Sequence, residues 1–240
     1  MSSRWRFWLI SVAALAGLAV TLSLGRWQLS RAAQKQAMQA ATASQGQLAA
    51  LDARALAGVD STALALHRRV RLRGSWVGDN TIYLDNRLMQ GRFGLYVVTP
   101  FLLQDRRDAV LIQRGWVPRN FMDRSSVPSI DTPAGIVEIE GRIAPAPAKL
   151  YELGAPEAGL IRQNLDLLQL RAESGLALLT VSVQQTGASS DGLARDWPET
   201  GSGAEKNQGY AFQWFGLSAL IAILYVWFQI VRRFIRPRAI

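Results

Sequence analysis

Two long apolar segments lie near the two ends of the sequence, and shorter alternating patterns lie between them. Residues 7–25 contain no charged side chain, and a second uncharged segment runs from Tyr210 to Val231. A helix of about 20 apolar residues crosses roughly 30 Å of hydrocarbon. The pattern therefore predicts two transmembrane helices, at residues 7–25 and 210–231, with short tails at residues 1–6 and 232–240.

Basic residues beside these segments predict their orientation, because cytoplasmic flanks are enriched in Lys and Arg. The outer flanks carry Arg4, Arg6, Arg232, Arg233, Arg236 and Arg238, whereas the inner flanks carry Arg26, Arg31, Lys35 and Lys206. We expect a two-pass protein of the bacterial inner (plasma) membrane, with both termini cytoplasmic and the central domain periplasmic. A cleaved signal peptide is the alternative for the first segment, but that segment is longer than the roughly 7–15 residues of a signal core.

Between the apolar segments the hydrophobic period changes to two, which is typical of half-buried strands. Further short strands follow, then a helical pattern after a capping residue, Asn164 or Asp166. The predicted strands are Val70–Trp76, Thr81–Leu84, Tyr96–Leu103, Ala109–Trp116, Gly135–Ile143 and Leu178–Gln184, with a hairpin turn at Asp105–Asp108 and a short helix at Asn164–Glu173. We expect an α+β domain over residues 59–186 that is β-dominated and mostly antiparallel.

Two connecting segments flank this domain. Residues 26–58 are rich in Gln and Ala, so they are expected to extend the first helix and to include a short amphipathic helix near Leu48–Leu56. Residues 187–209 contain several Gly, Ser and Asp residues, which predicts a flexible lead into the second transmembrane helix.

The net charge of +9 does not indicate a nucleic-acid-binding domain. All 18 acidic residues lie between Asp52 and Glu205, and 17 Lys and Arg residues between Ser44 and Glu205 nearly balance them. The other ten basic residues flank the two apolar segments. The excess charge therefore reflects topology and attraction to anionic headgroups of the lipid bilayer.

The chain contains no cysteine and one histidine, His67. This composition excludes disulfides, thiolate metal sites and iron–sulfur clusters. A lone histidine does not build a zinc site or a Ser-His-Asp triad, and no phosphate-binding or dinucleotide-binding motif is present. We expect neither enzymatic activity nor a metal site.

Two groups of residues near the membrane are candidates for binding. One group is a stripe on the extended first helix, formed by residues spaced by four: Trp27, Arg31 and Lys35. This stripe is either an interfacial aromatic belt with snorkelling cations or a docking surface for another membrane subunit.

On the second helix, Asn207, Tyr210, Ala211 and Trp214 share one face. That face is either part of an interfacial aromatic belt or a binding surface. The amide of Gln213 favours contact with a partner helix, because such amides usually pair within the membrane.

Within the domain, Arg87, Arg92, Arg114 and Arg119 are candidates for binding carboxylates, since a guanidinium forms two parallel hydrogen bonds with them. The competing interpretation is turn chemistry around Gly91 and Gly94 together with a buried Trp116. Arg87, Arg114 and Trp116 are our candidates for contact with a partner protein.

The chain resembles the Surfeit locus protein 1 family of membrane-anchored cytochrome c oxidase assembly factors. The resemblance rests on Leu24-Gly25-Arg26-Trp27-Gln28 with Arg31 and Lys35, Asp85-Asn86-Arg87 with Gly91 and Gly94, Thr99-Pro100, Arg114-Gly115-Trp116-Val117-Pro118, Gly141, and Tyr210-Ala211-Phe212-Gln213-Trp214-Phe215. The resemblance implies a non-enzymatic chaperone that helps insert haem a into the oxidase's catalytic subunit. Partners would be that subunit and the haem a synthesis machinery.

Family members commonly carry a histidine three residues before the tyrosine that opens the second span, where this chain has Asn207. Asparagine is a poor iron ligand, so the resemblance implies transient binding of haem a between Tyr210, Trp214 and Trp27 without ligation at that position. The alternatives are that this face contacts the oxidase without cofactor, or that the protein is a structural scaffold whose periplasmic domain binds another protein.

Overall fold

The computed structural model describes residues 3–59, 65–123, 126–147, 149–150, 159–188, 191–198 and 203–235. The chain divides into two compact units. The helical unit comprises Met1–Ala40 and Glu199–Ile240, and the sheet unit comprises Ala41–Pro198.

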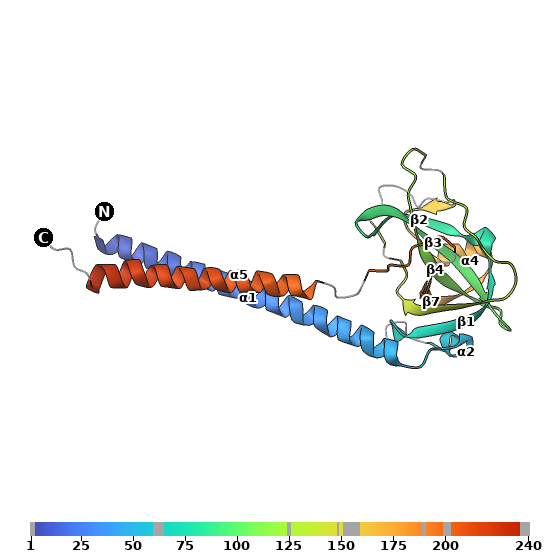
Figure 1. Cartoon of the computed structure of the whole chain (residues 1–240), viewed down its shortest axis with the longest axis horizontal. Coiled ribbons are helices and arrows are strands. Elements are labelled where there is room, and N and C mark those ends of the chain that lie inside the picture. Colours follow the sequence, from blue (N-terminus) through green and yellow to red (C-terminus); the bar gives the residue numbers. More distant parts are fainter. Residues whose placement is uncertain are drawn as a thin grey trace. The chain divides into compact units, whose positions relative to one another are not determined.

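The helical unit is an antiparallel pair of helices. Helix α1 spans Ser3–Gln47 and continues beyond this unit, and α5 spans Ala204–Tyr225 with a π-helical continuation, η2, at Val226–Ile235. Figure 1 shows α5 running beside the first part of α1. Ser11 of α1 contacts Tyr225 near one end of the pair, and Lys35 contacts Asn207 near the other.

Both helices are long and apolar enough to cross a bilayer, over Arg4–Gln47 and Ala204–Arg232. The predicted spans at residues 7–25 and 210–231 lie within them. This arrangement is consistent with a two-pass membrane protein.

One series of buried and half-buried positions on each helix recurs at alternating spacings of three and four. They are Ser11, Ala14, Leu18, Thr21, Gly25, Gln28, Ala32 and Lys35 on α1, and Ala204, Asn207, Ala211, Trp214, Ser218, Ile221 and Tyr225 on α5. A mean spacing of 3.5 residues keeps one stripe facing the partner helix. Most of these side chains are small or polar, which allows close approach and hydrogen bonds between helices in a membrane.

The sheet unit contains seven strands that form one sheet in the order β1-β5-β7-β4-β3-β2-β6. Strand β1 also pairs with β3, so the sheet curls into a barrel-like closure (Figure 1). The strands are β1 Arg69–Trp76, β2 Ile82–Met89, β3 Arg92–Leu103, β4 Asp108–Pro118, β5 Val137–Ala144, β6 Ile161–Arg162 and β7 Ala177–Gln185. The short helices are α2 Ala53–Ala57, η1 Gly78–Asn80 and α4 Leu167–Ser174.

The predicted α+β class is confirmed. The sheet is mixed, so the prediction of a mostly antiparallel sheet is not fully confirmed. Strand β7 is parallel to β4 and antiparallel to β5, and β6 is parallel to β2, whereas the other pairings are antiparallel. Because β4 and β5 run in opposite directions, a strand inserted between them must be parallel to one of the two. Hydrophobic alternation marks each strand but carries no information about its neighbour.

The barrel interior holds the main core, and additional elements cover part of its outer side. Leu72, Phe101, Ile112 and Val183 are 0% exposed and belong to one hydrophobic cluster. A second cluster packs Leu170 of α4 with residues of β2, β3, β4 and β7. Strand β4 is buried at nearly every position because both of its faces are covered.

The predicted extension of the first helix is present as the end of α1, and the predicted short helix near Leu48–Leu56 is present as α2 but starts later than predicted. Helix α2 begins only at Ala53, because Leu51 instead pairs with β1: its amide donates to the Arg69 carbonyl at 2.9 Å, and its carbonyl accepts from the Arg71 amide at 3.0 Å. Asp52 then caps α2 by accepting from the Ala55 amide at 2.8 Å. Asn164 and Asp166 were the alternatives predicted to cap α4, and the residue that caps it is Asp166.

The segment predicted as a flexible lead, residues 187–209, is ordered in much of its described part. Leu193 and Trp197 are buried, and Ala194 forms a β-bridge with Trp116. Helix α5 begins at Ala204, before the predicted start at Tyr210. The Gly and Ser content suggested flexibility, but Arg195 and Trp197 form hydrogen bonds that hold the segment on the sheet. Residues 189–190 and 199–202 of this prediction lie outside the described part.

Candidate functional site

The seam between α1 and α5 contains a ladder of polar contacts. The hydroxyls of Ser11 and Tyr225 lie 2.8 Å apart, and the Ser218 hydroxyl donates to Thr21 Oγ1 at 2.6 Å. The Ser11 and Thr21 hydroxyls also donate to backbone carbonyls one turn earlier in α1. The Trp214 carbonyl lies 3.0 Å from the Ser218 hydroxyl and competes with Thr21 for its single proton. These bonds satisfy polar groups that would be costly in hydrocarbon.

Asn207 lies at the end of this ladder, and its side chain bonds α1 through both of its polar atoms. Its Nδ2 donates to Gln28 Oε1 at 2.6 Å, and its Oδ1 accepts from Lys35 Nζ at 2.9 Å. Lys35 also lies 3.4 Å from the Gly203 carbonyl, so it contacts the residue that precedes α5. The amide of Asn207 is therefore a link between the helices.

The predicted aromatic site is only partly assembled. Trp27 and Tyr210 are both 54% exposed, whereas Trp214 is half-buried in the seam. Gln28 and Asn207 are hydrogen-bonded to each other, Trp27 adjoins Gln28, and Tyr210 is one turn from Asn207. The two exposed rings therefore lie at a similar level along the helix pair. Within the described part of the chain, no ring stacking joins these three side chains.

The predicted stripe of Trp27, Arg31 and Lys35 divides between two sides of α1. Arg31 is exposed and donates to Gln34 at 3.3 Å, while Lys35 turns into the seam. Gln213 is exposed on α5 and has no hydrogen bond with any described residue. Arg31 and Gln213 therefore remain accessible to a partner.

Arg114, by contrast, lies inside the sheet unit with 1% of its surface exposed. Its guanidinium donates to Thr132 Oγ1 at 2.8 Å and to the Asp131 carbonyl at 2.7 Å, and it lies 4.5 Å above the Trp76 ring. Burial lowers the pKa of Arg114, and the nearby Asp191 carboxylate opposes that effect.

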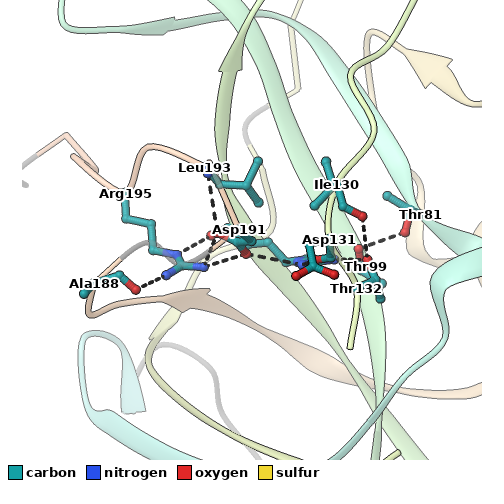
Figure 2. A network of polar contacts seen from close by, with 10 residues as sticks. Thr81, Thr99, Ile130, Asp131, Thr132, Ala188, Asp191, Leu193 and Arg195 are labelled. Carbon is teal, nitrogen blue, oxygen red and sulfur yellow. Dashed lines mark hydrogen bonds and ion pairs between the residues drawn. The ribbon is translucent and has the colours of Figure 1, made fainter. Parts of the chain in front are cut away.

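Asp191 is shared between two buried guanidinium groups. It accepts from Arg114 Nη2 at 3.2 Å and from Arg195 Nη2 at 2.7 Å (Figure 2). Arg195 also donates to the carbonyls of Arg114 and Ala188. The network fastens residues 188 and 191–195 to β4, which is a structural role.

Arg87 and Trp116 are likewise buried, at 5% and 7% exposure. Trp116 Nε1 donates to the Arg87 carbonyl at 2.9 Å, and Arg87 Nη2 donates to the Gln163 carbonyl at 2.7 Å. Burial lowers the pKa of Arg87, although the nearby Tyr96 opposes the shift. The partner contact predicted for Arg87, Arg114 and Trp116 does not fit these positions, because their side chains lie in the interior.

The other two arginines do not join them at one site. Arg119 forms an ion pair with Asp85, and Arg92 is exposed at the start of β3. The four arginines therefore do not converge on one carboxylate-binding site.

The residues present do not fit an axial iron ligand at position 207, because the Asn207 amide is already bonded by Gln28 and Lys35. His67 belongs to the sheet unit, where burial, with a smaller effect of the Arg142 charge, lowers its pKa. Among the described residues, no group of three or more His, Cys, Asp or Glu side chains is arranged to hold a metal ion.

Sequence reasoning missed Gln28 on α1 and, in the sheet unit, Asp191, Arg195 and Trp197. Gln28 was detectable, since Thr21, Gln28 and Lys35 recur every seven residues on α1. Asp191 and Arg195 lie in a Gly- and Ser-rich segment with no regular period. Their pairing with β4 depends on the fold.

Comparison with known proteins identifies the family. A sequence model of the SURF1 family matches residues 15–219. The chain belongs to the SURF1 family. This family is associated with cytochrome oxidase assembly, and the match extends over most of both helices and all of the sheet unit. A search of curated proteins found no match.

Proposed function

We propose that this protein is a non-enzymatic assembly factor for an aa-type haem-copper cytochrome c oxidase and assists insertion of haem a into the catalytic subunit. The observation that carries the proposal is the SURF1-family match across both apolar helices and the intervening sheet unit. The basic flanks favour cytoplasmic termini and a periplasmic sheet unit in the bacterial inner membrane.

In this proposal the helix pair contacts the catalytic subunit and the haem a synthesis machinery through its outward-facing residues. Arg31 and Gln213 are exposed and suit a polar contact with another membrane helix. Haem a is a transient ligand of the exposed Trp27 and Tyr210 rings and the half-buried Trp214 ring, without an iron bond from Asn207. The protein thereby acts as a chaperone of oxidase biogenesis.

A second candidate is a structural scaffold whose sheet unit binds another protein and which carries no cofactor. The bonding of Asn207 to Gln28 and Lys35 favours it, because the family's histidine position serves helix pairing in this chain. Both candidates use the same membrane anchoring.

A deletion strain that has no paralogue tests the assembly role. We expect lower aa-type oxidase activity and less haem a in its membranes, restored by the intact chain. Unchanged haem a spectra and oxygen uptake would reject the proposal. Purification of the protein from haem-a-producing cells then separates the two candidates: a haem absorption band supports the first, and co-purification of a periplasmic protein in its absence supports the second.

A further inference from the structure

One groove of the sheet unit is lined by arginines that have no part in the proposed assembly role. It has a volume of about 910 Å³ and is open to solvent. Its floor is the outward face of β1, one wall is formed by residues 50–54, and the other by Gln104–Arg106 in the β3–β4 turn. Five arginines line it, and we call it the arginine groove: Arg54, Arg69, Arg71, Arg73 and Arg106.

The backbone of β1 explains why a groove forms there. On this edge, β1 pairs with two separate segments: the Leu51 amide donates to the Arg69 carbonyl at 2.9 Å, and the Gln104 amide donates to the Arg73 carbonyl at 2.9 Å. The arginine groove lies between these two attachment points.

Three of the five arginines have unused guanidinium groups. Arg71 pairs with Glu140 at 2.6 Å, and Arg106 pairs with Asp108 at 2.6 Å. Arg54, Arg69 and Arg73 make no side-chain hydrogen bond or ion pair with any residue that the structure describes, and all three are exposed. They are free to bind an external anion.

Spacing along β1 indicates the shape of that anion. Residues 69, 71 and 73 point to one face of the strand, which separates successive side chains by roughly 6.6 Å. An extended peptide repeats its own alternate side chains at the same distance. Guanidinium groups bind carboxylates through two parallel hydrogen bonds, so acidic residues four positions apart in an extended peptide match the unpaired Arg69 and Arg73.

The walls on both sides of the groove favour a single peptide chain over a lipid surface. Headgroups at a bilayer surface form a broad, nearly flat layer, whereas the floor at β1 lies between two raised segments. Asp52, Asp105 and Glu138 also line the groove, so a ligand must place its negative groups beside Arg54, Arg69 and Arg73 rather than spread charge evenly along the groove.

We propose that the arginine groove binds an extended acidic segment of a partner protein, with Arg69 and Arg73 as the principal carboxylate ligands and Arg54 on the facing wall. This inference goes beyond the assembly role and does not depend on it, because the binding can be measured without an oxidase.

The test uses the purified full chain in neutral detergent and a fluorescein-labelled peptide of alternating Glu and Thr. A peptide with Gln in place of Glu is the ligand control. We expect saturable binding of the Glu peptide by fluorescence polarisation, weakened by added salt as expected for exposed charges. Equal affinity for the Gln peptide would overturn the proposal.

Matched variants locate the site. R69Q/R73Q is expected to weaken peptide binding about fivefold or more, whereas R26Q/R92Q removes the same charge elsewhere and is expected to change it less than about twofold. R54Q tests the facing wall independently, should R69Q/R73Q alter the circular dichroism spectrum. Equal losses in the matched double variants would contradict the proposed site. Displacement of the peptide by dihexanoyl phosphatidylglycerol at lower concentration than by unlabelled peptide would show a headgroup site instead.

Discussion

Nδ2 of Asn207 on α5 donates a hydrogen bond to Oε1 of Gln28 on α1 across 2.6 Å. The other atom of the same amide, Oδ1, accepts from Lys35 Nζ. The Asn207 side chain is therefore bonded to α1 through both of its polar atoms. Because these bonds join the two helices, we expect Asn207 to stabilise the helix pair.

Replacement of Asn207 by Leu should therefore destabilise the helix pair. The change leaves Gln28 and Lys35 without their partner, and hydrogen bonds between membrane helices contribute about 0.6 kcal/mol, with a maximum near 1.7. We expect a loss of about 1 kcal/mol, measured as a lower thermal midpoint of the purified protein in detergent. Gln213→Leu on the exposed side of α5 is the control, and an equal shift in both variants would contradict the role of Asn207.

Gly25 is a second point at which the two helices approach closely. A Cβ atom added there would lie 2.6 Å from the Phe215 ring. Gly25→Val should therefore push the helices apart and lower the thermal midpoint, because overpacking typically costs about 1–3 kcal/mol. Gly216→Val is the matched control, since a Cβ at Gly216 meets no atom within 4 Å. An unchanged midpoint for Gly25→Val would show that the helices do not pack as described.

Asp191 should be one of the most sensitive positions of the sheet unit. Asp191→Asn removes the carboxylate that two buried guanidinium groups share, those of Arg114 and Arg195. Breaking a buried pair costs about 3–5 kcal/mol, because the remaining charge is left uncompensated. We expect a loss in that range by urea unfolding followed through tryptophan fluorescence.

The control for Asp191 is Glu140→Gln, which breaks an ion pair whose two side chains are 63% and 58% exposed. That change should cost less than about 1 kcal/mol, as exposed pairs do. If the two variants lost equal stability, the proposed fastening of residues 191–195 to β4 would be wrong.

The sequence predicted the elements of this fold better than their arrangement. Six strands followed from hydrophobic alternation, and each is present as β1, β2, β3, β4, β5 or β7. The two-residue strand β6 is too short to have a period. The parallel pairing of β4 with β7 was not predicted, because neighbours in a sheet are chosen by packing that brings distant segments together.

A residue role that follows from one helix leaves a signal in the sequence, even where that signal was missed, whereas a role that follows from the fold leaves none. The seven-residue spacing of Thr21, Gln28 and Lys35 marks a helix-pairing face in the sequence itself. Arg114 was a candidate for partner contact because buried and exposed arginines look alike in sequence. Trp116 was a candidate together with it, and its burial agrees with the competing interpretation. Only the covering of β4 by residues 191–197 places them in the interior.

Helix α4 should make the sheet unit sensitive to acid. Asp166 caps its first turn, and hydrogen bonds from the Gln169 and Leu168 amides hold the pKa of Asp166 below its ordinary value. The hydrogen bond from Arg162, followed by that from Gln169, likewise lowers the pKa of Glu173. Because both folded-state pKa values lie below the unfolded ones, the stabilisation is complete above the unfolded values, near 4, and is lost as the pH falls through the folded values.

Urea midpoints of the full chain and of D166N/E173Q, compared between about pH 7 and about pH 3, test this sign. The variant should be less stable at neutral pH, since neutral side chains hydrogen-bond Arg162 and the helix N-terminus more weakly. The difference should shrink as the pH falls, because protonation of the two carboxylates removes the same charges. Asn is a good helix cap, so D166N alone should lose less at neutral pH than Asp166→Ala. A stability difference that stays constant over this pH range would exclude the two carboxylates as the source of the acid sensitivity.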